Sequence, residues 1–137
     1  MDFGIRRAPP RGLLLIGSLI GANFNTTADQ PISILLPAGA RFRINNIFIS
    51  TPSISLTTAV GGIYTGAGKT GAQVVPNSQG YSALTTNAAN TTGSLLVATV
   101  TNANTVVWDA LTLYFALTTP QGSAATADIH IVGIQLG

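Results

Sequence analysis

The chain has 137 residues, enough for one domain with a substantial hydrophobic core. It contains no cysteine, which excludes disulfides and thiolate metal sites. Only 7% of its residues are charged, against about 25% in ordinary soluble domains, while 46% are hydrophobic and the net charge is +2. Disordered chains have few apolar residues, so we expect a folded protein whose weakly charged surface is covered by copies of itself or by a partner.

The first twelve residues, 1–12, are predicted to form an extended N-terminal arm. They contain half of the six basic residues, and two adjacent prolines favour extended backbone. The arm either orders against the acidic surface of a partner or is a frayed, solubilising terminus. Three arginines without interleaved aromatic residues are a poor nucleic-acid footprint, so no nucleic acid is expected. The candidate partner-binding residues of the arm are Arg6, Arg7, Pro9, Pro10 and Arg11.

The segment after the arm has two interpretations. Basic residues followed by "LLLIGSLIGA" resemble an export signal. The proline pair interrupts the junction, however, and the apolar run is far shorter than the roughly 20 residues of a membrane span. We therefore interpret residues 13–20 as the first strand, and expect a protein that is neither exported nor bound to a membrane.

Period-two alternation with β-branched residues recurs along the rest of the chain, and no useful stretch has apolar residues at helical spacing. Apolar residues change parity across Asn45 and Asn46, which indicates a bulge. Without crossover helices, seven to nine short strands predict an all-β antiparallel β-sandwich over residues 13–137, with the jelly roll as the specific expectation. The further predicted strands are residues 30–36, 41–50, 59–65, 72–75, 81–84, 94–100, 105–119 and 127–136.

The glycine-rich stretch "GAGKTG" matches the glycine pattern of a dinucleotide-binding fold, and its end is typical of a phosphate-binding loop. A phosphate loop needs glycine where this chain has Ile63. The dinucleotide version needs a following helix, which Pro76 would break, and an acid about 20 positions on, whereas none appears before Asp109. We interpret the stretch as a turn between two strands, with Lys69 in solvent and no cofactor.

The histidine His130 lies two residues after Asp128 on the last predicted strand, where a base and its carboxylate could face one side. We expect both to point away from the core, as surface groups. No serine lies in a G-x-S-x-G elbow and the four aspartates are scattered singly, so neither an enzyme nor a metal site is expected. The apolar set expected to face the core is Ile129, Ile131, Ile134 and Leu136.

Aromatic side chains leave a second hypothesis open, a carbohydrate-binding jelly-roll module that uses Trp108, Tyr114 or Tyr64. Alternation predicts that Trp108 and Tyr114 share one side of a strand and that Phe115 takes the other, so core packing explains at least one of them. An exposed aromatic ring beside Asn or Asp would favour the carbohydrate hypothesis.

Two stretches carry a resemblance, "GGIYTGAGKTGAQVVPNSQGYSAL" and "LTLYFALTTPQGSAATADIHIVGIQL". They are similar to small proteins encoded among the virion genes of tailed bacteriophages. The resemblance covers roughly residues 54–137 and leaves out the arm. It implies a structural virion protein: a homo-oligomeric decoration or cement protein, with a trimer favoured, that binds the major capsid protein on the outer capsid surface. A vertex, fibre or tail component is the alternative, and the resemblance supplies no catalytic residues.

Overall fold

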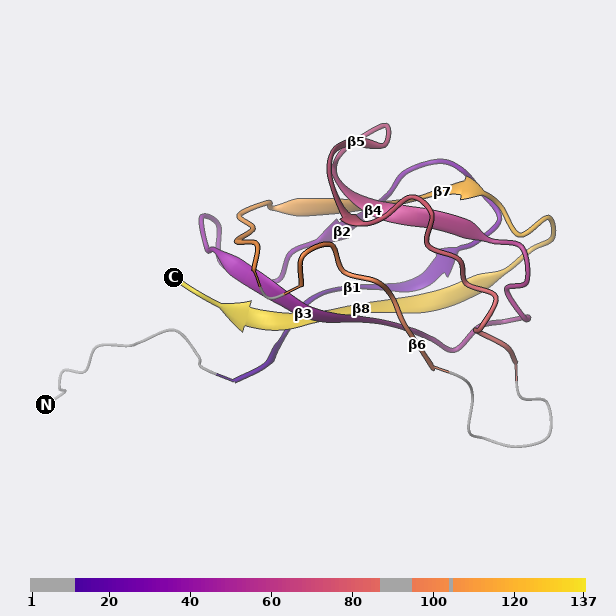
Figure 1. Ribbon diagram of the computed structural model, residues 1–137, viewed down its shortest axis with the longest axis horizontal. Coiled ribbons are helices and arrows are strands. Elements are labelled where there is room, and N and C mark those ends of the chain that lie inside the picture. Colours follow the sequence, from indigo (N-terminus) through magenta and orange to yellow (C-terminus); the bar gives the residue numbers. More distant parts are fainter. Residues whose placement is uncertain (1–11, 87–94, 104) are drawn as a thin grey trace, which may run out of the picture.

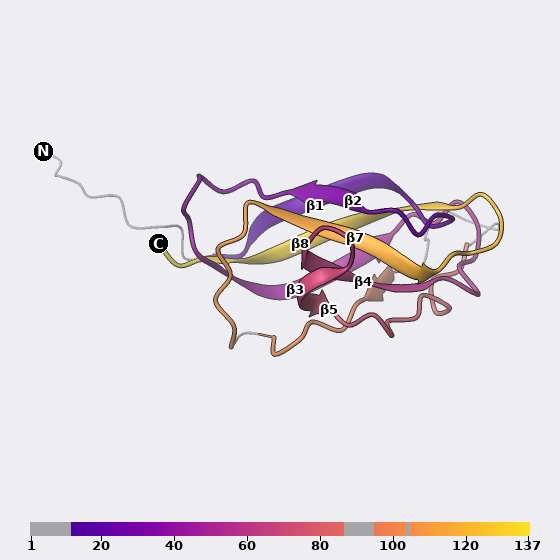
Figure 2. The ribbon, with the colours of Figure 1, turned by 90° about the horizontal axis from the view of Figure 1, so that it is seen from above.

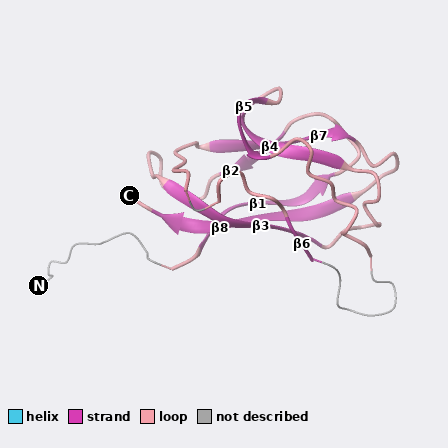
Figure 3. Ribbon diagram, in the orientation of Figure 1, coloured by secondary structure: helices cyan, strands magenta, loops and turns pink. Residues whose placement is uncertain are grey.

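The computed structural model describes residues 12–86, 95–103 and 105–137, and every regular element in these residues is a β-strand (Figure 3). Two antiparallel sheets of four strands each form the two layers of a sandwich (Figure 1). The prediction of an all-β antiparallel β-sandwich is therefore confirmed. The strands are β1 Leu14–Asn23, β2 Gln30–Ser33, β3 Phe42–Ser50, β4 Val60–Gly66, β5 Thr70–Val75, β6 Leu95–Val97, β7 Thr112–Thr119 and β8 Thr126–Gln135.

The strand order is β1-β8-β3-β6 in one sheet and β2-β7-β4-β5 in the other. Four of the neighbouring pairs are β1 with β8, β2 with β7, β3 with β6, and β4 with β5. The first strand thus pairs with the last, and the pairing continues inward to a central hairpin. Figures 1 and 2 place the C-terminus at one narrow end of the sandwich, where β8 ends.

The hydrophobic core fills the space between the two sheets and has aromatic rings at its centre. The rings of Phe24 and Tyr81 meet edge to face with centroids 5.1 Å apart, and Phe115 lies 4.9 Å from Phe24. The Tyr81 hydroxyl donates a hydrogen bond to the Gly61 carbonyl at 3.0 Å, which satisfies its polar end inside the core. Burial, and to a lesser degree the neighbouring Tyr64, raises the pKa of Tyr81 far above its ordinary value.

Strands β3 and β8 approach each other very closely at Gly133, which pairs with Ile44. A Cβ atom added at Gly133 would overlap the carbonyl oxygen of Arg43 and lie 3.1 Å from the Ile44 Cα. Next to this point the register of the two strands shifts between Ile44 and Asn46, so the predicted bulge is confirmed. Glycine is the residue that permits this close approach of two backbones.

Four predicted strands are wrong in part or in whole. Those expected over residues 30–36 and 94–100 are shorter, Gln30–Ser33 and Leu95–Val97. Residues 81–84 form a turn in which the Leu84 amide donates to the Tyr81 carbonyl at 2.9 Å, because both side chains enter the core from a loop. The strand expected over residues 105–119 begins only at Thr112, and before it Trp108 makes an isolated backbone bridge to Phe42. Core burial accounts for Tyr81, Leu84 and Trp108, whereas Val107 and Leu111 are exposed.

Candidate functional site

The outer side of the β1-β8-β3-β6 sheet is built by the alternation of β8. Buried and partly exposed residues alternate along β8 from Ala127 to Ile134, so its buried residues face the core and the others face outward. Cross-strand pairing extends this outward set in rows across the sheet. One row is Ser18, His130, Phe48 and Val97, and the next is Leu15, Val132 and Asn46.

Hydrophobic side chains dominate this outer side, which we call the apolar face. Leu13 lies two residues before Leu15 and therefore faces the same side of the sheet. Ile20 also faces outward, because the preceding residue, Leu19, packs against the core. Of the nine large hydrophobic side chains exposed in the described residues, five lie here, with 46% to 66% of their surface exposed. These five lie at the two edges of the sheet, on or beside β1 and on β6, and the half-buried Phe48, Val132 and Ile134 of β3 and β8 lie between them. An apolar surface that extends across a sheet marks an interaction site, unlike single exposed leucines. The apolar face consists of Leu13, Leu15, Ile20, Phe48, Leu95, Val97, Val132 and Ile134.

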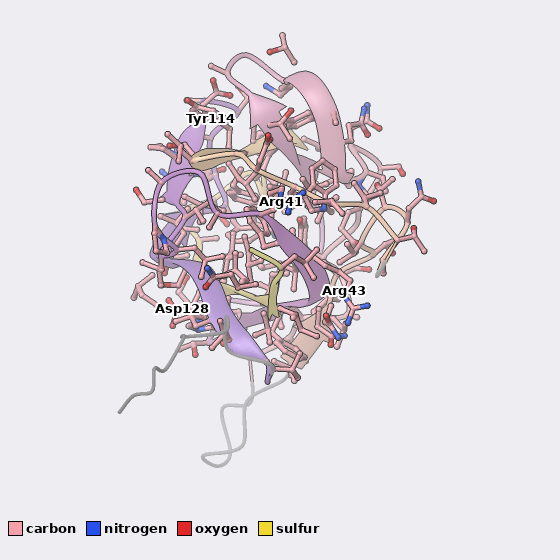
Figure 4. All side chains as sticks on the ribbon, turned by 90° about the vertical axis from the view of Figure 1, so that its left-hand side faces the viewer. Arg41, Arg43, Tyr114 and Asp128 are labelled. Atoms are coloured by element: carbon pink, nitrogen blue, oxygen red, sulfur yellow. The ribbon has the colours of Figure 1, made fainter. Side chains whose placement is uncertain are left out.

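Opposite charges lie toward the two ends of the apolar face. Arg43 lies in β3 beside Ile134, and Asp128 lies in β8 beside Ser50, at the other end of the paired strands. On β8, Asp128 lies six residues before Ile134, the partner of Arg43. Figure 4, which looks along the long axis of the molecule, shows the two labelled side chains on opposite sides of the view. The Nε of Arg43 is buried without a hydrogen-bond partner in the part of the chain that the structure describes. One N–H group of the guanidinium is therefore left without an acceptor, while the side chain as a whole is half-buried on the outward side of β3.

His130 and Asp128 both point away from the core, as predicted, and both are half-buried. Among the described residues no hydrogen bond joins them: Asp128 Oδ1 instead accepts from the Gly21 amide at 2.8 Å. The expectation that Ile134 and Leu136 face the core is wrong, because β8 alternates without a bulge and Gly133 takes the inner position. Ile134 therefore adds to the outward side, and this error in parity concealed the apolar face at the level of sequence.

The glycine-rich stretch is a turn between β4 and β5, as predicted, and it projects above its sheet (Figure 1). Gly68 and Lys69 both have positive φ, 72° and 60°. The Gly68 amide donates to Asp29 Oδ2 at 2.6 Å, and the exposed Lys69 donates from Nζ to the Thr27 carbonyl at 2.9 Å. An amide that would have to bind phosphate is thus occupied by a carboxylate of the same chain, and a strand rather than a helix follows.

The aromatic residues named for sugar stacking do not form one platform. Tyr64 is buried, and Trp108 packs against the core from a loop. The prediction that Trp108 and Tyr114 share one side of a strand is wrong, since Trp108 precedes β7. Tyr114, labelled in Figure 4, remains half-buried between its cross-strand neighbours Pro31 and Tyr64. None of the three rings is fully exposed, so the exposed aromatic ring that would favour a carbohydrate site is not found among Trp108, Tyr114 and Tyr64.

Within residues 12–86, 95–103 and 105–137, no group of three or more His, Cys, Asp or Glu side chains is placed to hold a metal ion. The same residues contain no helix that is long and apolar enough to cross a membrane. The arm residues predicted to bind a partner lie outside the described residues: Arg6, Arg7, Pro9, Pro10 and Arg11. Comparisons with family models, with characterised proteins and with solved structures find no match.

Proposed function

We propose that the protein is a structural subunit that functions by binding copies of itself and the surface of a larger protein assembly. The apolar face is the observation that carries this proposal. An isolated domain with 7% charged residues gains little electrostatic protection from sticking to its neighbours. A symmetric oligomer or a lattice removes the exposed leucines, isoleucine and valine of that face from water.

The resemblance to small virion proteins of tailed bacteriophages makes the proposal more specific. The protein is then a homo-oligomeric decoration or cement protein that binds the major capsid protein on the outer surface of the capsid. A trimer is the favoured form, because threefold and quasi-threefold lattice positions suit such a protein. A vertex, fibre or tail component is the alternative place in the virion, and no enzymatic activity is proposed.

The strand pairing supports the finer fold prediction, a jelly roll. Strands pair from the outside inward, β1 with β8 through to β4 with β5, and the resulting ribbon is divided between two four-stranded sheets. Eight strands in two sheets is the jelly-roll arrangement, which recurs among viral capsid domains. Fold alone does not establish function, so this point agrees with the virion proposal without carrying it.

Two measurements test the proposed function together. Light scattering and native mass spectrometry at micromolar concentration report the oligomeric state, and we expect an oligomer. Mass spectrometry of purified particles of the phage that encodes the chain reports its presence in the virion, and we expect many copies per particle. A stable monomer that is absent from the particles would contradict the proposal.

A further inference from the structure

The apolar face has the dimensions of a small protein interface. β1, β3 and β8 each present roughly seven residues to the face, and β6 presents three. At 3.3 Å per residue and about 4.8 Å between strands, they cover about 400 Å² in projection. Two such faces in contact remove about 800 Å² from water before the relief of the side chains is counted, which is at the low end of specific interfaces. The face therefore has the size of a small interface between two copies.

The charges of the apolar face make it complementary to itself. Arg43 lies toward one end and Asp128 toward the other, on the neighbouring strands β3 and β8. Consider a second copy related to the first by a two-fold axis that lies between the two faces and runs perpendicular to the strands. This rotation places Arg43 of each copy near Asp128 of the other copy. The two groups are then offset by about one strand spacing, 4.8 Å, which an arginine side chain spans easily.

The same rotation also matches the apolar residues. Leu13 and Ile20 lie toward opposite ends of the face on β1, so each packs over the other in the second copy. At the centre the row containing His130 lies over the row containing Val132. His130 then meets an aliphatic side chain, and the two histidines of the pair are not stacked on each other.

We propose that two copies of this protein pack face to face through the apolar face, with antiparallel strands and with Arg43 of each copy paired to Asp128 of the other. This inference rests on the proposed function, because it names the surface through which the protein self-associates. The pairing gives the Arg43 guanidinium a carboxylate, and among the described residues its Nε has no hydrogen-bond partner. A two-fold contact gives assemblies with an even number of copies, namely a dimer, or a hexamer if trimers also form.

Charge exchange tests the predicted pairing. Arg43→Glu or Asp128→Lys alone sets like charges against each other, and we expect the dissociation constant of the two-fold contact to rise at least about tenfold. The double variant restores the pair in reverse and should return to within about threefold of wild type. Asp128→Asn keeps an acceptor for the Gly21 amide while it removes the charge, so it separates loss of pairing from loss of that local hydrogen bond. Single variants that weaken association without rescue by the double variant would overturn the antiparallel arrangement.

A matched pair of leucine variants tests the apolar contact. Leu95 on the face and Leu111 away from it are 60% and 61% exposed, so lysine at either position should leave the fold intact. We expect Leu95→Lys to halve the native mass in sedimentation velocity, and Leu111→Lys to leave it unchanged. Circular dichroism spectra equal to that of wild type and a cooperative thermal transition confirm that neither variant has unfolded.

The outcomes separate this inference from the proposed function. A wild-type oligomer whose mass is unchanged by every face variant overturns the face-to-face contact and leaves self-association standing. Face variants that lose attachment to capsids but keep their oligomeric mass show that the face binds a foreign protein, which also overturns the inference. A wild-type monomer at micromolar concentration contradicts both.

Discussion

Replacing Gly133 with alanine tests whether the close approach of β3 and β8 determines the stability of the sheet that bears the apolar face. The added Cβ would meet the carbonyl oxygen and carbon of Arg43 and the Cα of Ile44, all of them backbone atoms. No side chain can rotate away to make room, so the two strands must separate. The bulge between Ile44 and Asn46 directly beside this point leaves little freedom for such a shift.

The expected cost follows from the geometry. Overpacking costs about 1–3 kcal/mol, and contact with backbone on the opposite strand puts Gly133→Ala near the upper value. Alanine also reduces the conformational entropy of the unfolded chain, which offsets about 0.4–1 kcal/mol. The free energy of unfolding should therefore fall by about 2 kcal/mol. For a domain of this size this lowers the Tm by roughly 6–10 °C.

The matched control is Gly80→Ala, because a Cβ at Gly80 has no atom within 4 Å and the residue is exposed. Gly80→Ala should keep the wild-type Tm or raise it slightly. Thermal and urea unfolding, followed by circular dichroism, measure both variants. If Gly133→Ala melts within about 2 °C of Gly80→Ala, the inference that β3 and β8 admit only glycine at this position is wrong.

Three further predictions follow from the sites described above. Burial raises the pKa of Tyr81 above its ordinary value of 10.0, so the unfolded state releases this proton at a lower pH than the folded state. The free energy of unfolding should therefore fall as pH rises above about 10. Urea unfolding from pH 8 to 11 should show that decline, and the decline should be smaller in Tyr81→Phe. Lys69→Ala removes one exposed hydrogen bond and should lower the free energy of unfolding by less than about 1 kcal/mol in the same assay. Calorimetry should detect no binding of ATP or NAD to the wild-type protein. Nucleotide binding that disappears in the variant would contradict the interpretation of this stretch as a turn. Deleting residues 1–12 should leave the β domain folded but weaken co-sedimentation with particles that lack the protein, and retention of the intact form should decline with salt; equal retention of the two forms across a salt series would show that the arm is only a terminus.

Local chemistry in the sequence determined several parts of this fold. Period-two alternation of β-branched residues was sufficient to predict an all-β sandwich, because side chains on a strand must alternate between core and solvent. The parity change at Asn45 and Asn46 identified the bulge in β3, and the glycine-rich stretch before β5 identified a turn with positive φ. Each of these features depends on a few adjacent residues, so no distant part of the chain was needed to predict it.

Only the tertiary structure decided which strands pair and which residues at the end of β8 face the core. The pairing of β1 with β8 joins the two ends of the described chain, and no local signal specifies so distant a partner. Tyr81 and Leu84 look like strand residues in sequence because a buried loop and a buried strand place the same demand on side-chain hydrophobicity. Alternation predicted correctly that Ile129 and Ile131 face the core, but not that the inner position after Ile131 falls to Gly133, where the backbones of β8 and β3 meet closely. Because of this contact Ile134 and Val132 face outward beside His130, and the resulting apolar face could be recognised only once the strands were assembled into a sheet.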